Sequence, residues 1–110
     1  MSLHMFDLTG KRALITGSSQ GIGLALARGL AAAGAEIVLN GRDTAKLSMA
    51  AKTLADAGAT VHQLAFDATD HAAVKSSVDG FEAATGPVDI LINNAGMQHR
   101  TELQDFPADA

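Results

Sequence analysis

The chain contains no cysteine, which excludes disulfide bonds, thiolate nucleophiles and cysteine-ligated zinc or iron–sulfur centres. It also lacks an excess of positive charge, because 8 lysine and arginine residues face 12 aspartate and glutamate residues, so nothing in its charge favours nucleic acid. No apolar run approaches the ~20 residues of a membrane span, and the first residues lack the pattern of a secretory signal. We therefore expect a cytoplasmic protein whose partner is a small molecule, with neither nucleic acid nor a membrane as partner.

The chain does contain enough apolar sequence for one domain, since hydrophobic residues make up 47% of its 110 residues. Short apolar runs at 12–16, 36–40, 61–66 and 89–93 predict four strands. Between them, segments of helical period predict helices over 22–33, over 44–57 and from Asp70 to Gly86. Consecutive strand–helix–strand units predict an α/β fold, a three-layer Rossmann-type doubly wound parallel sheet with strand order 3-2-1-4.

Local signals mark the ends of these helices. Gly34 and Gly58 stand where a left-handed residue commonly ends a helix, and Asp43 and Asp70 are predicted N-caps. Four apolar residues at helical spacing are more simply explained as core than as a cofactor site. These residues are Met49, Val74, Val78 and Phe81.

The fourth predicted strand is the last, although in this strand order it pairs on its far side with a fifth. Strand 89–93 would then be an unprotected apolar edge, while residues 106–110 are typical of the first turn of another helix. We therefore expect residues 1–110 to be the N-terminal part of a single larger domain. The alternative is a small complete domain whose own tail covers that edge. The second methionine, Met5, leaves open that residues 1–4 are a remnant of cloning.

A glycine-rich turn joins the first predicted strand to the first predicted helix. Gly17, Gly21 and Gly23 have the spacing G-x-x-x-G-x-G, and free N–H groups at a helix start favour a phosphate. Gly17 permits a tight turn, Gly21 lets a diphosphate approach the backbone, and Gly23 lets the helix pack closely on the strand. Ile22 replaces the second glycine of a Walker loop and no lysine follows it, which argues against triphosphate hydrolysis. The alternative is a turn that binds no ligand.

The turn after the second predicted strand, Asn40-Gly41-Arg42, lies where a dinucleotide-binding fold recognises its ribose. An acidic residue there would hold the 2′-hydroxyl of NAD, whereas Gly41 leaves room and Arg42 offers a guanidinium to a 2′-phosphate. We therefore expect NADP rather than NAD. The alternative for Arg42 is a solvated residue just before a helix.

Polar and small residues also follow the third and fourth predicted strands. Asp67 and the run Asn93-Asn94-Ala95-Gly96 therefore lie at the carboxyl ends of parallel strands, where open α/β sheets bind ligands. The alternative for Asp67 is a turn or cap residue. For Asn93 we favour a structural role, because short amides commonly bond to nearby backbone.

This combination closely resembles the short-chain dehydrogenase/reductase family. The resemblance runs from about Phe6 to the end of the chain, and it is carried by Thr16, the three glycines, Asp67 and residues 93–96. Within the family, residues 40–42 and 93–100 look most like the gluconate 5-dehydrogenases. The resemblance implies an NADP-dependent oxidoreductase that interconverts a secondary alcohol and a ketone, with a sugar acid such as gluconate or 5-ketogluconate as substrate. The alternatives are a 3-oxoacyl-[acyl-carrier-protein] reductase and a non-catalytic nucleotide-binding module.

The resemblance also implies a role for each matching residue. Arg42 would contact the adenosine 2′-phosphate. Asp67 would contact the adenine amino group, with the backbone of Ala68 beside it. The residues of the diphosphate loop would be Gly17, Ser18, Ser19, Gln20, Gly21, Ile22 and Gly23. The residues that line the ribose side and brace the sheet would be Asn94, Ala95 and Gly96.

The catalytic groups of the family are a tyrosine, a lysine one turn later, a serine and an asparagine. This chain contains no tyrosine, and hydride transfer needs a group that exchanges the hydroxyl proton. No catalytic residue can therefore be named, and we expect the 110 residues alone to be inactive. Family resemblance also implies that the complete protein is a homo-oligomer, a tetramer.

Arg100 is a weaker candidate, because its guanidinium would match the carboxylate of a sugar acid. Ordinary surface charge remains the favoured reading of this residue. The four histidines, His4, His62, His71 and His99, are scattered without ligand spacing, so no metal site is expected.

Overall fold

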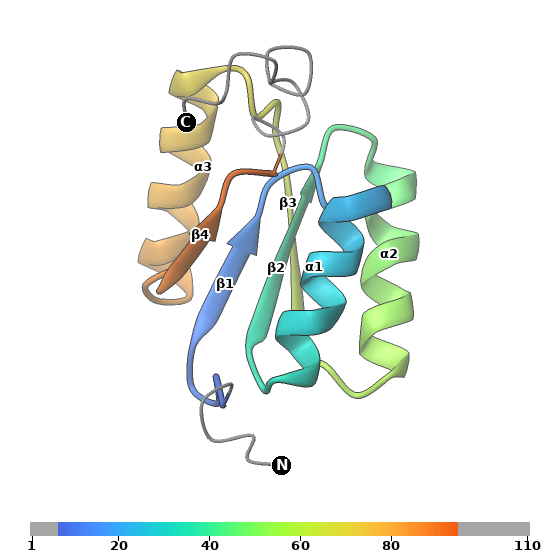
Figure 1. Ribbon diagram of the computed structural model, residues 1–110. Helices are drawn as coiled ribbons and strands as arrows, with labels where there is room; N and C mark the ends of the chain where they lie inside the picture. Colours follow the sequence, from blue (N-terminus) through green and yellow to red (C-terminus); the bar gives the residue numbers. More distant parts are fainter. Residues whose placement is uncertain (1–6, 95–110) are drawn as a thin grey trace, which may run out of the picture.

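The structure, a computed structural model, describes residues 7–94 as one parallel sheet with helices on both faces (Figure 1). The strands are β1 (Arg12–Ile15), β2 (Glu36–Gly41), β3 (Val61–Ala65) and β4 (Ile90–Ile92). The helices are α1 (Gly21–Ala32), α2 (Thr44–Asp56) and α3 (His71–Ala84). The order β3-β2-β1-β4 confirms the predicted Rossmann-type topology.

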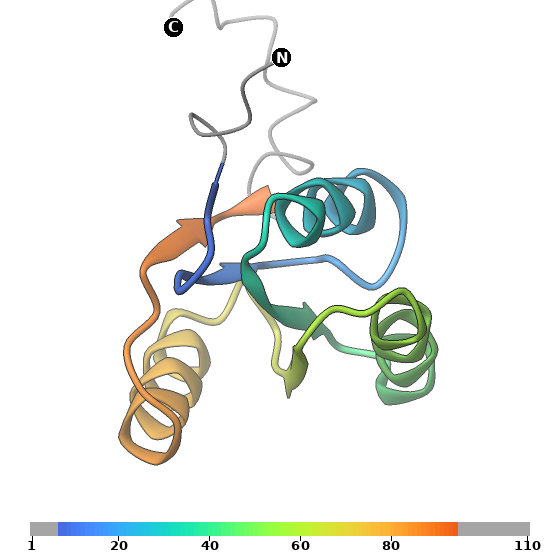
Figure 2. The same cartoon turned by 90° about the horizontal axis from the view of Figure 1, so that it is seen from below.

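Helices α1 and α2 cover one face of the sheet and α3 covers the other (Figure 2). Side chains alternate along each strand, so Ile37 and Leu39 of β2 face α1 and α2 while Val38 faces α3. Strands β1 and β2 lie in the middle of the sheet, and they read as continuous apolar runs because both of their faces are covered.

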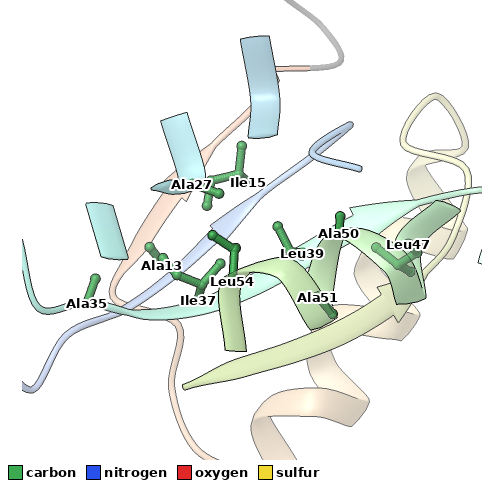
Figure 3. Packing of buried hydrophobic residues seen from close by; sticks show 10 residues of the cluster. All are labelled: Ala13, Ile15, Ala27, Ala35, Ile37, Leu39, Leu47, Ala50, Ala51 and Leu54. Atoms are coloured by element: carbon green, nitrogen blue, oxygen red, sulfur yellow. The ribbon is translucent and has the colours of Figure 1, made fainter. Parts of the chain in front are cut away.

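The two faces bury unequal amounts of apolar surface. The face under α1 and α2 holds the larger cluster (Figure 3), formed by Ala13, Ile15, Ala27, Ala35, Ile37, Leu39, Leu47, Ala50, Ala51 and Leu54. The buried residues of the other cluster are Leu14, Val38 and Phe81. Leu91 of β4 pairs in register with Leu14, yet Leu91 is 60% exposed. Within residues 7–94, the α3 face is therefore only partly covered beside β4.

The structure confirms the predicted residues at the helix ends. Gly34 and Gly58 adopt φ angles of 103° and 101°, the left-handed region that favours glycine. The Asp43 carboxylate accepts hydrogen bonds from the backbone N–H groups of Ala45 and Lys46, and that of Asp70 accepts one from Ala73.

The prediction that Met49 belongs to the core is wrong, because this residue is 71% exposed. The buried side of α2 is formed by Leu47, Ala50, Ala51 and Leu54. At about 100° per residue, Met49 lies on the opposite side of the helix from that row. Phe81 is buried as predicted, and Val78 packs half-buried beside it.

A cluster of polar groups closes the edge where the strands begin. Arg12 of β1 donates from Nε to Glu36 Oε2 of β2 at 2.9 Å and from a terminal nitrogen to the Pro87 carbonyl, also at 2.9 Å. His62 of β3 bonds to the same Glu36 oxygen. Arg12 and His62 both contact the ring of Phe81, so this cluster lies under α3.

Candidate functional site

A cleft of about 780 Å³ opens at the edge where β1, β2 and β3 end. Its walls are the turn between β1 and α1, the turn between β2 and α2, and the segment that follows β3; Figure 1 shows these ends at one edge of the sheet. The cleft brings together seven predicted site residues, Gly17, Ser19, Gln20, Gly21, Arg42, Asp67 and Ala68. Its lining also includes residues that were not predicted as ligand contacts, namely Asn40, Asp43, Lys46, Phe66 and Thr69.

The glycines of the first turn are required for two different structural reasons. Gly17 and Gly21 adopt φ angles of 61° and 63°, which side chains rarely tolerate. A Cβ atom on Gly21 would meet nothing within 4 Å, so the backbone there is open to a ligand. A Cβ on Gly23 would instead lie 2.3 Å from the Gly17 carbonyl oxygen and 2.8 Å from Ser18 Cα. Gly23 is therefore required for α1 to pack against the turn itself.

Helix α1 begins at this cleft without a side-chain cap. Its N-cap residue is Gln20, whose side chain makes no capping hydrogen bond, whereas Asp43 and Asp70 cap α2 and α3. The first N–H groups of a helix have no partner within the helix, and they carry its positive dipole end. The start of α1 can therefore hold an anion.

Ser18 lies in the predicted diphosphate loop, but its polar groups bond within the protein. Its backbone N–H donates to the Asn40 carbonyl at 2.8 Å, and its hydroxyl donates to the Ile15 carbonyl at 2.6 Å and accepts the Asn40 N–H at 2.9 Å. The residue is fully buried. The predicted role of Ser18 as a ligand contact thus becomes a positioning role, which fixes the turn against the end of β2.

The buried side chain of Asn40 ties the three walls of the cleft together. Its Oδ1 accepts the Gly17 N–H at 2.9 Å, and its Nδ2 donates to the carbonyls of Leu64 and Phe66 at 3.0 and 3.1 Å. Sequence reasoning named Asn40 only as part of a turn. The available signal was an amide directly after the apolar run Ile37-Val38-Leu39, since asparagine is depleted in strands.

Arg42 and Asp67 face each other across the cleft, with 3.4 Å between guanidinium and carboxylate. Both are accessible, with 72% and 41% of their side chains exposed, so the pair itself contributes little stability. The hydroxyl and N–H of Thr69 donate to the other Asp67 oxygen, and these bonds, followed by Arg42, hold the pKa of Asp67 below its usual range. Asp67 is therefore an ionised acceptor at neutral pH.

Asn93 and Asn94, the two described residues after β4, contact the first turn and the end of β1 and do not line the cleft. Asn94 is buried, and its Nδ2 donates to the Gly17 carbonyl at 3.1 Å. The Asn93 side-chain oxygen accepts a hydrogen bond from the Thr16 hydroxyl at 3.1 Å. The predicted residues Ala95, Gly96 and Arg100 lie outside the described residues.

Ile22, another residue of the predicted loop, lies on the first turn of α1. It is 62% exposed and does not line the cleft.

Within residues 7–94 no three histidine, aspartate or glutamate side chains come together in a way that could hold a metal ion. None of the three helices in this part of the chain combines the length and apolar character needed to span a membrane.

The glycine turn, the cleft and the strand order can be compared with known proteins. A family model described as short chain dehydrogenase matches residues 11–110. The chain belongs to the short-chain dehydrogenase family. The match includes the whole turn between β1 and α1 and all the residues that line the cleft.

Two curated members of this family are similar over most of the chain. Gluconate 5-dehydrogenase of Gluconobacter oxydans (strain 621H) is 50% identical over 102 residues, which cover 93% of this chain and 40% of that protein. The 5-keto-D-gluconate 5-reductase of Escherichia coli (strain K12) is 39% identical over 103 residues, covering 94% of this chain and 41% of that protein. The chain thus spans about 40% of the length of these relatives.

A solved member has a similar structure. The gluconate 5-dehydrogenase from Burkholderia cenocepacia J2315, in complex with NADP and tartrate, matches with a TM-score of 0.77 and 49% sequence identity. The match covers 83% of this chain and 36% of that one. The sheet of residues 7–94 is therefore the family's sheet in both order and connection.

Proposed function

We propose that residues 1–110 are the cofactor-binding N-terminal part of a single Rossmann-type domain in an NADP-dependent dehydrogenase. The complete protein would interconvert a secondary alcohol and a ketone. One observation carries the proposal: the cleft has an uncapped helix start and open glycine backbone at one end and an exposed guanidinium at the other. The similarity to a structure solved with NADP supports the same cofactor.

The groups of the cleft match the successive parts of the cofactor. The N–H groups at the start of α1 and the open backbone at Gly21 suit the diphosphate. The Asp67 oxygen that faces Arg42 suits the adenine amino group, and Arg42 suits the 2′-phosphate. When bound, NADP supplies the hydride acceptor, while the residues of this chain bind and orient it.

The preference for NADP over NAD rests on the end of β2. Gly41 provides no carboxylate to hold a ribose 2′-hydroxyl, and a Cβ there would already meet the Ser19 hydroxyl oxygen at 3.1 Å. Arg42 follows, always charged and able to make two hydrogen bonds to phosphate oxygens. The two residues together favour the cofactor that carries a 2′-phosphate.

The test is kcat/KM of the complete protein with NADP and with NAD, before and after Arg42→Ala. Preference for NADP should fall about tenfold, because hydrogen bonds to charged groups contribute about 1.5–3 kcal/mol and exposure keeps the effect near the lower figure. NAD kinetics should change little. Arg28→Ala, which removes an exposed arginine of α1 outside the cleft, is the matched control. A wild type that prefers NAD, or equal losses with both cofactors, would reject the proposal.

The substrate we propose is a sugar acid such as gluconate or 5-ketogluconate, because the similar proteins from G. oxydans and E. coli are named for these compounds. No residue of the described part contacts the substrate in this proposal. A screen of sugar acids, uncharged polyols and 3-oxoacyl compounds with the complete protein and NADP(H) tests it. Turnover confined to 3-oxoacyl compounds would favour the reductase alternative. The cytoplasmic location, the tetramer and the inactivity of the 110 residues alone stay predictions.

A further inference from the structure

We propose that Lys46 is a second cationic contact for the 2′-phosphate and thereby a specificity-determining residue. This inference rests on the proposed NADP cofactor. Lys46 lines the same cleft as Arg42, and these two residues are the cations among its described lining residues. Sequence reasoning identified Arg42 alone, because only Arg42 adjoins the end of β2.

The backbone of Lys46 is held in place beside the cleft. Lys46 is the third residue of α2, and its N–H donates to the Asp43 carboxylate at 3.2 Å, next to the 2.9 Å bond from Ala45. The following residue, Leu47, is 1% exposed and belongs to the larger core cluster. The first turn of α2 is therefore fixed at both its cap and its core side. The flexible part of Lys46 is its side chain, which is exposed at the cleft.

The ammonium group of Lys46 is available for a ligand. Within residues 7–94, Lys46 has no carboxylate at ion-pair distance. Two other helical lysines, Lys52 and Lys75, each pair with an aspartate four residues later, at 3.1 and 2.9 Å. The residue four positions after Lys46 is Ala50, which is buried in the core, so no such partner exists on its own helix.

The charge of a bound 2′-phosphate would exceed the positive charge that Arg42 alone supplies in the cleft. A phosphate monoester carries about −1.5 to −2 at neutral pH. Arg42 already faces Asp67, so part of its charge is balanced before a phosphate arrives, and Asp43 adds a second acidic residue to the lining of the cleft. The glycine turn adds N–H groups but no cation, because its exposed polar residue is the neutral Gln20. Lys46 supplies the missing positive charge.

The experiment measures binding of 2′,5′-ADP and of 5′-AMP to the complete protein by titration calorimetry, so that no turnover is needed. Lys46→Gln should weaken 2′,5′-ADP about threefold to fivefold, the upper range for an exposed charge pair, and leave 5′-AMP unchanged. Lys46→Arg should keep the wild-type affinity for both. Lys52→Gln removes an exposed lysine from the same helix outside the cleft, and it should change neither.

The outcomes separate this inference from the proposed function. If wild type binds 2′,5′-ADP no better than 5′-AMP, the NADP cofactor and the role of Lys46 both fail. If Arg42→Ala reduces that preference but Lys46→Gln does not, only the role of Lys46 is overturned. Equal weakening of both ligands by Lys46→Gln would show a structural effect and would also overturn it. The double variant Arg42→Ala/Lys46→Gln should lose more preference than Arg42→Ala alone.

Discussion

Helices α1, α2 and α3 all start at the same edge of the sheet, because each follows a parallel strand, yet their starts differ. Asp43 and Asp70 satisfy the first N–H groups of α2 and α3 with a carboxylate. Gln20 leaves those of α1 without a side-chain partner, beside Gly21, where a Cβ would meet nothing within 4 Å. A good N-cap contributes about 0.5–2 kcal/mol to stability. The start of α1 lacks that contribution, and its N–H groups are left available to an anion.

The largest effect should come from closing the space between α1 and its turn. In Gly23→Ala the new Cβ would lie 2.3 Å from the Gly17 carbonyl oxygen, which belongs to backbone and can move only with the turn. We expect the free energy of unfolding of the complete protein to fall by about 3 kcal/mol or more, with loss of cofactor binding. Denaturant unfolding followed by circular dichroism measures the change.

Gly29→Ala is the matched control in the same helix, since a Cβ there meets nothing within 4 Å. This substitution should raise stability by about 0.5–1 kcal/mol, the helix propensity of alanine over glycine. Equal effects of the two substitutions would contradict the close packing of α1 against its turn.

A smaller effect should follow from giving α1 the cap that the other helices have. Gln20→Asp should raise the free energy of unfolding by about 1 kcal/mol. It should also weaken NADP binding about tenfold, because the new carboxylate occupies the N–H groups and repels the diphosphate. Gln20→Asn caps without charge and should weaken binding less. Asp70→Ala should do the reverse at α3, lowering stability by about 1 kcal/mol with unchanged affinity. A more stable Gln20→Asp that binds NADP normally would disprove the anion site.

The smallest effect is expected at the opposite edge, where polar groups bond to one another. The hydrogen bond from Arg12, followed by that from His62, holds the pKa of Glu36 below its usual value. The stability that ionised Glu36 contributes is therefore complete above that value and is lost as pH falls through the lower pKa of the folded state. Thermal unfolding between pH 6 and pH 3 should show a shallower decline for Glu36→Gln than for wild type. NADP affinity at neutral pH should not change; if it does, the two edges are not independent.

The strand positions and the helix caps could be predicted because their signals are local, and the sheet order followed from the alternation of strands and helices. Apolar runs such as Ile37-Val38-Leu39 define strands, and Asp43 or Asp70 precede helices directly. The prediction of a buried Met49 was wrong because the spacing of apolar residues gives the period of a helix but does not show which side of that helix faces the sheet.

The bonding within the candidate site could not be predicted in the same way. The partners of the Asn40 side chain are 23 to 26 residues away in sequence, and only the folded sheet brings them to it. Likewise, the packing of Leu47 against the core directs the first turn of α2 toward the cleft and makes Lys46 part of its wall. Residue spacing along the chain shows neither the partners of Asn40 nor the position of Lys46 in the wall of the cleft.

The contact between Gly41 and Ser19 has a consequence for redesign of cofactor preference. A Cβ at position 41 would lie 3.1 Å from Ser19 Oγ and 3.2 Å from Ser19 Cβ, so it would press on the first turn. An aspartate introduced there to bind a free ribose hydroxyl would require the Ser19 side chain to shift, within the loop that we propose for the diphosphate. A single substitution at position 41 would therefore gain a contact with the ribose and disturb the packing against Ser19. We therefore expect a change of cofactor preference at position 41 of this chain to succeed best when position 19 receives a smaller side chain at the same time.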